Sequence, residues 1–165
     1  MKNQLLLLGI LMEGKTHGYQ LNEYVKHAMS LYTDLKKSTT YFVLDQLEKD
    51  GYVSHEIERE GKRPERRVYE ITEEGETHFF KLLRECISSY TLTHLTDNMG
   101  IAFMGKLEPS EAKELLESKK QKIQSELNKF NGLQSHEGNL KYVIDHNLAY
   151  LDADLKWINN ILKEL

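Results

Sequence analysis

The segment from residue 36 to residue 71 constrains the fold more than any other part of the chain. Ser38 has a side chain suited to a helix N-cap, and it precedes a run with helical periodicity. Three apolar residues of that run share one face: Val43, Leu44 and Leu47. Gly51 follows at the position where many helices end in the left-handed conformation, which costs glycine little. The pattern predicts a helix capped by Ser38 that ends before Gly51.

Two short strands and a turn follow this predicted helix. Apolar and aromatic residues favour both strands: Tyr52, Val53 and Ile57 in the first, and Val68, Tyr69 and Ile71 in the second. Gly61 to Pro64 is the turn between them, and it places Lys62 and Arg63 at its tip. A helix followed by a two-stranded hairpin with a basic tip is typical of a winged helix.

The residues on either side of this segment complete a winged helix-turn-helix. Apolar periodicity predicts a first helix over residues 3–13, and Thr16 is the expected N-cap of a second helix over residues 17–30. Thr72 is the expected N-cap of a fourth helix. We therefore expect a DNA-binding domain over residues 1–90, with three helices, a two-stranded wing and the connecting fourth helix.

Residues 91–165 predict a helical dimerisation domain, which makes the whole protein mainly α. Pro109 suits the first position of a helix that ends near Phe130, and residues 131–139 form a turn. In the last helix, apolar residues alternate at spacings of four and three, the repeat of a coiled-coil seam. The seam residues are Ile144, Leu148, Leu151, Leu155, Ile158 and Leu162. We expect a helical hairpin that packs on a second copy; the alternative is that the seam packs only within its own chain.

Charge and side-chain chemistry on the third predicted helix favour contact with double-stranded DNA. The net charge is −4, but residues 1–70 hold 11 Lys/Arg and 11 Asp/Glu, so the excess of acid lies in residues 71–165. Local basic patches make phosphate contacts, and hydroxyl and aromatic groups at a helix N-terminus can reach base edges. The expected DNA-binding residues are Tyr19, Lys37, Ser38, Thr39, Tyr41, Phe42, Lys62 and Arg63. The alternative for the helix alone is an ordinary amphipathic helix with a polar side.

Several stretches of the chain resemble the PadR-type family of transcriptional regulators. In the N-terminal half they are residues 7–21 (LLGILMEGKTHGYQL), 39–44, 47–51, 61–64 (GKRP) and 68–75 (VYEITEEG). Residues 107–116 and 151–157 are similar to the family's longer C-terminal dimerisation domain. Phe42 and Ser38 depart from the proline and glycine that are common there in the family. The resemblance implies a homodimeric repressor that binds a pseudo-palindromic operator and, in some members, is released by a small molecule.

A small-molecule effector needs a pocket, and the candidate residues lie near the junction of the two expected domains. They are Phe79, Phe80, Met99, Phe103, Met104 and Trp157. Aromatic and methionine side chains at helical spacing are more often core residues, which is the alternative for this set.

Other functional classes find little support in the sequence. The seven histidines are never three or four positions apart, and Cys86 is alone, so we expect no metal and no cofactor. No phosphate-binding glycine loop or nucleophile motif is present, so we expect no enzyme. The apolar run from Leu5 to Met12 is too short to span a bilayer and lacks a cleavage site, which predicts a cytoplasmic protein without a membrane partner. The remaining alternative is a winged-helix module for protein–protein contact without DNA readout.

Overall fold

The computed structural model describes residues 1–28, 35–59, 65–90, 98–133 and 138–165. The chain divides into two compact units, Met1–Leu92 and Thr93–Leu165. Each unit has a hydrophobic core of its own. The predicted turn from Gly61 to Pro64 lies outside the described residues, and so do the side chains of Lys62 and Arg63.

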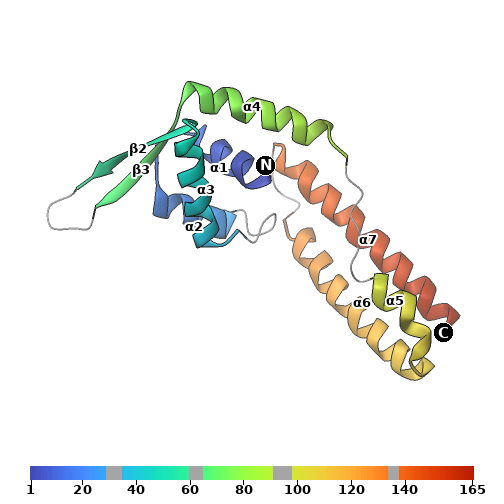
Figure 1. The fold of residues 1–165 in the computed structure, drawn as a ribbon. Coiled ribbons are helices and arrows are strands. Elements are labelled where there is room, and N and C mark those ends of the chain that lie inside the picture. Colours follow the sequence, from blue (N-terminus) through green and yellow to red (C-terminus); the bar gives the residue numbers. More distant parts are fainter. Residues whose placement is uncertain (29–34, 60–64, 91–97, 134–137) are drawn as a thin grey trace. The chain divides into compact units, whose positions relative to one another are not determined.

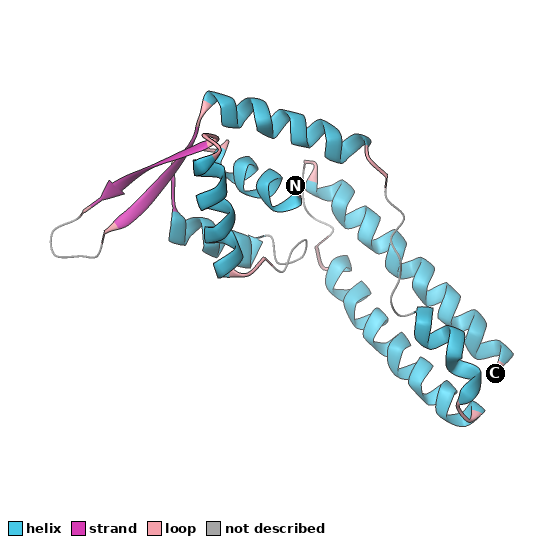
Figure 2. Cartoon of the chain, viewed as in Figure 1, coloured by secondary structure: helices cyan, strands magenta, loops and turns pink. Residues whose placement is uncertain are grey.

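The first unit is a winged helix-turn-helix followed by a fourth helix (Figure 1). Its elements are α1 (Lys2–Leu11), β1 (Thr16–His17), α2 (Gly18–Ala28), α3 (Lys37–Lys49), β2 (Val53–Glu58), β3 (Arg66–Ile71) and α4 (Glu73–Ser88). The strands form an antiparallel sheet in the order β1-β3-β2, in which Tyr69 pairs with Thr16 on one side and with His55 on the other. The two longer strands project beyond the helices as the wing (Figure 2). The predicted fold class is confirmed.

Helix α1 provides the centre of the first core because it is apolar around most of its circumference. Leu7, Leu8 and Leu11 are buried, and α3, α4 and β3 all pack against this helix. The other buried core residues include Leu21, Val25, Val43, Leu44, Leu47, Val53 and Tyr69. The three apolar residues predicted to share one face of α3 therefore all point into this core. Packing on α1 fixes which face of α3 is left for solvent.

A set of hydrogen bonds joins the end of α3 to the start of α4. Gly51 has φ +77°, and the backbone N–H of Tyr52 donates to the carbonyl of Leu47 at 2.8 Å, which closes the helix as a Schellman motif. The Thr72 hydroxyl donates to the Gly51 carbonyl at 2.7 Å and accepts from the N–H of Gly75 at 3.0 Å. Both the left-handed Gly51 and the Thr72 N-cap are confirmed. The Thr72 side chain thus links the end of α3 to the start of α4.

Two predicted helix starts are wrong. Helix α3 begins at Lys37, and its N-cap is Lys36 without a side-chain hydrogen bond, so Ser38 lies inside the first turn. Thr16 does not cap α2; it lies in β1, where it pairs with Tyr69 of β3. A strand of two residues has no periodicity that a sequence pattern could reveal, and its pairing is set by the distant strand β3.

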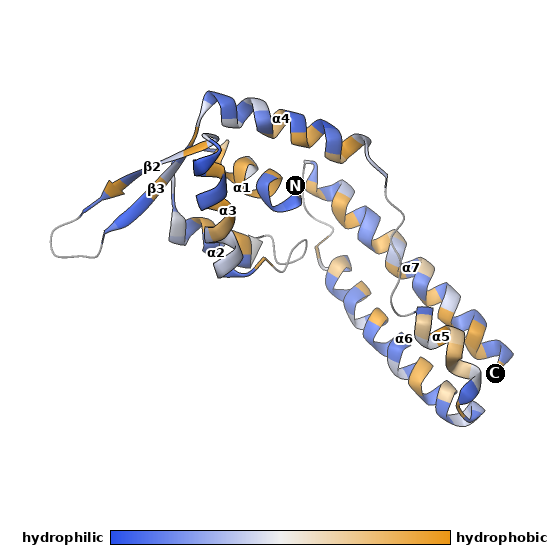
Figure 3. Cartoon of the chain, in the orientation of Figure 1, coloured by the Kyte–Doolittle hydropathy of each residue, from blue (hydrophilic) through white to orange (hydrophobic). Residues whose placement is uncertain are grey.

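The second unit is a helical hairpin with a short helix beside it. Its elements are α5 (Asn98–Phe103), a 3-10 turn η1 (Met104–Lys106), α6 (Pro109–Asn131) and α7 (Leu140–Glu164). Helices α6 and α7 pack along each other in antiparallel fashion, and hydrophobic residues recur along both (Figure 3). Pro109 stands in the first turn of α6, as predicted.

The predicted seam of α7 is used inside this hairpin. Leu155 and Ile158 form a core with Ile123 of α6, and Leu151 and Leu162 pack partly buried against it. Ile144 is also buried. The predicted hairpin is confirmed. The role of these residues in pairing two copies stays a prediction, and three of the six side chains are already covered by their own chain.

Candidate nucleic-acid interface

The outer face of α3 carries most of the predicted DNA-binding residues. Phe42 is 63% exposed, Lys37 and Ser38 are exposed, and Thr39 is half-buried. Thr40 points the other way, is fully buried, and donates its hydroxyl proton to the Lys36 carbonyl at 3.3 Å. Burial of Thr40, Leu44 and Leu47 fixes the rotation of α3 about its axis. The Phe42 ring, in the second turn of the helix, therefore faces solvent.

Tyr19 stands beside this face, at the start of α2. Its ring is 46% exposed and stacks on His17 at a centroid distance of 5.6 Å. Gly18 has no side chain between α2 and α3: a Cβ there would lie 3.0 Å from the Tyr69 ring and 3.1 Å from the Tyr41 ring. The close approach explains the glycine in the His-Gly-Tyr turn, because it lets the half-buried Tyr41 pack directly on the α2 backbone.

Arg66 and Arg67 belong to the same surface and were not among the predicted residues. The Arg66 guanidinium lies 5.4 Å from the centroid of the Tyr19 ring, a cation–π contact. Nη1 of Arg67 lies 3.2 Å from Oδ1 of Asp45 on α3. Both arginines, with Tyr19 and Tyr41, line a hollow of about 260 Å³ at the base of the wing. The cluster of basic residues at positions 62–67 could have indicated both arginines from the sequence. The prediction included only Lys62 and Arg63 as DNA-binding residues.

Two exposed ion pairs and one buried tyrosine lie on or beside the strands near this surface. Arg59 and Glu65 pair at 3.4 Å at the last described positions before the wing tip, and Lys15 pairs with Glu70 at 2.8 Å. The hydrogen bond to Glu70 raises the pKa of the Lys15 ammonium. Below them, burial raises the pKa of the Tyr69 hydroxyl, so this group stays neutral at physiological pH. The buried, neutral Tyr69 thus lies beneath the exposed arginines, and the two exposed ion pairs add little to the stability of the strands.

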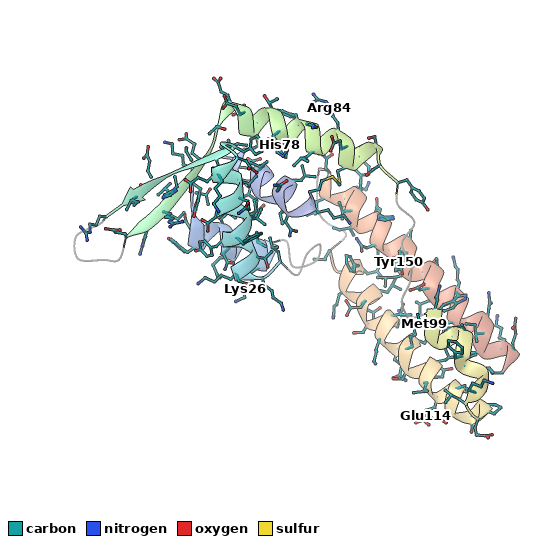
Figure 4. All side chains as sticks on the ribbon, in the orientation of Figure 1. Lys26, His78, Arg84, Met99, Glu114 and Tyr150 are labelled. Atoms are coloured by element: carbon teal, nitrogen blue, oxygen red, sulfur yellow. The ribbon has the colours of Figure 1, made fainter. Side chains whose placement is uncertain are left out.

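The six candidate effector residues fall into both units. In the first unit Phe79 packs partly buried against the core, where a Cβ on Gly9 would lie 3.2 Å from its ring, and Phe80 meets it edge-on at 5.3 Å. In the second unit Met99 and Phe103 are exposed on α5, with Met99 projecting from that helix in Figure 4. Met104 and Trp157 are half-buried. Phe79 thus behaves as a core residue, which was the alternative for this set.

Two further kinds of site, metal sites and membrane-spanning helices, concern the described part of the chain. No group of three or more His, Cys, Asp or Glu side chains there could hold a metal ion. None of the described helices combines the length and apolar character needed to cross a bilayer.

Comparison with known proteins identifies the first unit. Residues 7–81 match the model of the Transcriptional regulator PadR-like family. A curated relative, the Negative transcriptional regulator PadR of Bacillus subtilis (strain 168), is 25% identical over 128 residues, which are 76% of this chain and 69% of the relative.

Two solved structures of Bacillus subtilis PadR have a similar fold along nearly the whole chain. The structure in complex with operator DNA gives a TM-score of 0.83 at 21% identity and covers 99% of both chains. The structure in complex with p-coumaric acid gives a TM-score of 0.76 at 20% identity and covers 96% of this chain and 92% of that one. The family match over residues 7–81 shows that the first unit carries a PadR-like domain, and the whole chain shares the fold of Bacillus subtilis PadR.

Proposed function

We propose that the chain is a repressor that binds a double-stranded, pseudo-palindromic operator as a homodimer and is released by a small molecule. The observation that carries the proposal is the exposed face of α3 beside Tyr19 and Arg66 in a PadR-like domain. The curated relative is a negative transcriptional regulator, and a protein of the same fold has been solved with operator DNA.

In this proposal α3 lies in the major groove of the operator. Thr39 and Phe42 face the base edges, where a phenyl ring can contact the methyl group of thymine. Phosphates are contacted by a second group of residues: Tyr19, Lys37, Ser38, Tyr41, Arg66 and the wing-tip residues Lys62 and Arg63. The phosphate contacts position the helix and the base contacts specify the sequence.

Phe42→Ala is expected to change which bases the protein prefers, on the order of 1–3 kcal/mol at the contacted position. The ring is exposed, so its loss leaves the core of the first unit intact. Selection of bound duplexes from random DNA, followed by competition binding, measures the change. Ile87→Ala is the matched control, because Ile87 is an exposed apolar residue on α4 outside the proposed surface. An unchanged preference in Phe42→Ala would assign base readout to a different face.

Arg66→Gln is expected to weaken binding to all DNA sequences alike and to reduce the slope of log K against log salt by about one. The variant lacks the guanidinium and so loses one phosphate contact. The neighbouring Tyr19 ring stays in place because it still stacks on His17. Salt titrations on mixed-sequence duplex DNA measure the slope, and Lys113→Gln on the exposed side of α6 is the control.

The same titration tests the whole proposal. Binding of the unmodified chain to mixed-sequence DNA that falls steeply with salt supports a DNA-binding repressor. If no duplex binds even at low salt, the chain is a winged-helix module for protein–protein contact instead.

The homodimer is proposed to form through the helices of the second unit. Because Ile144, Leu155 and Ile158 are buried in the hairpin, the second copy is expected to meet neighbouring positions on α7. Val143 and Tyr150 are exposed, lie seven residues apart on one side of α7, and are one position away from the seam. A two-fold pair of winged helices would read two half-sites about one helical turn apart.

The proposed function also implies where the protein works and that it needs no catalytic activity. A protein that reads operator DNA works where that DNA lies, so we place it in the cytoplasm. Binding and release of DNA require no catalysis and no cofactor. The relative's complex with p-coumaric acid supports release by a small molecule, whereas the six effector candidates of this chain remain a prediction.

A further inference from the structure

Three side chains at the base of the wing form a connected stack: His17, Tyr19 and Arg66. The centroids of the His17 and Tyr19 rings lie 5.6 Å apart, with 26° between the ring planes. The Arg66 guanidinium lies 5.4 Å from the centroid of the same Tyr19 ring. Because Tyr19 contacts both of the others, the position of the Arg66 guanidinium depends on the position of the Tyr19 ring.

His17 has the best-covered side chain of the three. It pairs with Val68 in the sheet, and its backbone N–H donates to Oε1 of Gln20 at 3.4 Å. Its side chain is 24% exposed with Nδ1 buried, whereas Tyr19 and Arg66 are exposed. Residues opposite one another in paired strands share a face, and so do residues two positions apart, which places His17, Val68 and Arg66 on one face of the sheet. The sheet therefore fixes the His17 ring on the same side as Arg66.

The carboxylates beside Arg66 in the hairpin have other partners. Glu58 is the residue opposite Arg66 in the β2–β3 pair, but its carboxylate lies 3.7 Å from Nε2 of His17. Glu65, the preceding residue, pairs with Arg59 at 3.4 Å. Within the described ranges, no carboxylate forms an ion pair with Arg66. The guanidinium is thus held by an aromatic ring and not by an acid, so its charge stays available to a phosphate.

We propose that His17 is a positioning residue for DNA binding: its ring fixes the Tyr19 ring, which in turn fixes the Arg66 guanidinium for an operator phosphate. A long arginine side chain loses rotamer freedom when it binds, and a guanidinium already placed on a ring loses less. His17 acts only through Tyr19 and Arg66 and does not itself contact DNA. The inference rests on the DNA-binding function proposed above, but the stack can also be examined without DNA.

The first test removes the His17 ring or replaces it with another ring. The variants are made in a full-length Glu58→Gln chain, because loss of the His17 nitrogen would otherwise release the Glu58 carboxylate next to Arg66. His17→Ala should weaken binding to mixed-sequence duplex DNA about three- to tenfold and lower the slope of log K against log salt by up to about one. His17→Phe keeps an aromatic partner for Tyr19 and should bind as the Glu58→Gln chain does. Equal losses in both variants would overturn the proposal. Tyr24→Ala, which removes another exposed ring of α2, is the control.

A double-mutant cycle separates positioning from a general loss of structure. In a chain that already carries Arg66→Gln, His17→Ala should weaken DNA binding by less than about twofold, because the group that His17 positions is gone. A full effect in that chain would mean that His17 acts independently of Arg66, which overturns the proposal. Urea unfolding of the same variants measures the stability of the first unit. If His17→Ala unfolds early, His17→Leu takes its place, because leucine keeps the bulk without an aromatic ring.

Nuclear magnetic resonance of the arginine Nε–H groups tests the stack in the DNA-free chain. The ring current of Tyr19 should shift the Arg66 signal, which is identified by its loss in Arg66→Gln. The signal should return to the ordinary arginine position in His17→Ala and stay shifted in His17→Phe. An Arg66 signal that is unaffected by His17→Ala would overturn the inference.

Failure of this inference and failure of the proposed function give different results. If the unmodified chain binds no duplex at low salt, the repressor function fails and the role of His17 fails with it. If the unmodified chain binds DNA and the His17 variants bind equally well with the same salt slope, only the role of His17 fails.

Discussion

Gly75→Ala is expected to destabilise the first unit by about 3 kcal/mol or more, because Gly75 has the tightest surroundings of the glycines in the described residues. A Cβ at Gly75 would lie 1.9 Å from the Tyr52 carbonyl oxygen and 2.8 Å from Cγ1 of Ile71. The first of these is a backbone atom, so no side-chain rotation relieves the clash. Helix α4 must move away, which weakens the hydrogen bonds that the Thr72 N–H and hydroxyl donate to the carbonyls of Tyr52 and Gly51.

Urea unfolding measures this effect, with two signals that separate the units. Far-UV circular dichroism reports both units, whereas Trp157 fluorescence reports the second. We expect an earlier loss of part of the helical signal in Gly75→Ala and an unchanged Trp157 transition. Gly100→Ala is the matched control, because its Cβ has open space. An unaltered midpoint for Gly75→Ala would show that α4 can move away from the Tyr52 backbone at little cost in free energy.

Leu155→Asp is expected to lower operator affinity by roughly 10²- to 10⁴-fold, although residue 155 lies outside the DNA surface. Leu155 packs with Ile123 and Ile158 in the hairpin core, and a carboxylate there is buried without a partner. The hairpin opens, the proposed dimer surface is lost, and one winged helix is left to bind one half-site. The first unit should remain folded, because it has a separate core.

Sedimentation and operator binding test this expectation together. Asn160→Asp adds the same charge at an exposed position of α7 and should remain dimeric with normal affinity. Weak, salt-sensitive binding to non-operator DNA should survive in Leu155→Asp. A variant that stays dimeric and binds the operator normally would mean that two-fold assembly does not depend on this hairpin.

Elements with local chemical signals could be predicted from the sequence. Gly51 and Thr72 mark the end of α3 and the start of α4 because a left-handed residue and a hydroxyl cap act within one turn of helix. Pro109 marks the start of α6 because a proline, which has no N–H, fits the first turn of a helix. These signals, with the spacing of the buried residues of α3, were sufficient for the winged-helix fold.

Features that depend on distant residues could not be predicted. The pairing of Thr16 with Tyr69 joins segments more than fifty positions apart in the sequence, and nothing in the sequence near Thr16 indicates a strand. A heptad pattern in α7 is the same whether the partner helix belongs to its own chain or to another, so the burial of Leu155 by α6 needed a structure. The sequence alone does not indicate that Arg66 belongs to the DNA surface. The structure does, because the Arg66 guanidinium lies over the ring of Tyr19.

The ion pair between Arg67 and Asp45 bears on how fast a repressor of this kind finds its operator. Arg67, one of the two arginines at the wing base, is already paired with the Asp45 carboxylate on α3, and the chain has a net charge of −4. Both features weaken attraction to DNA of arbitrary sequence, which competes for the protein with about 10⁶–10⁹ sites in a genome. In the repressor proposed above, weaker binding to those competing sites leaves a larger share of the protein free to bind the operator.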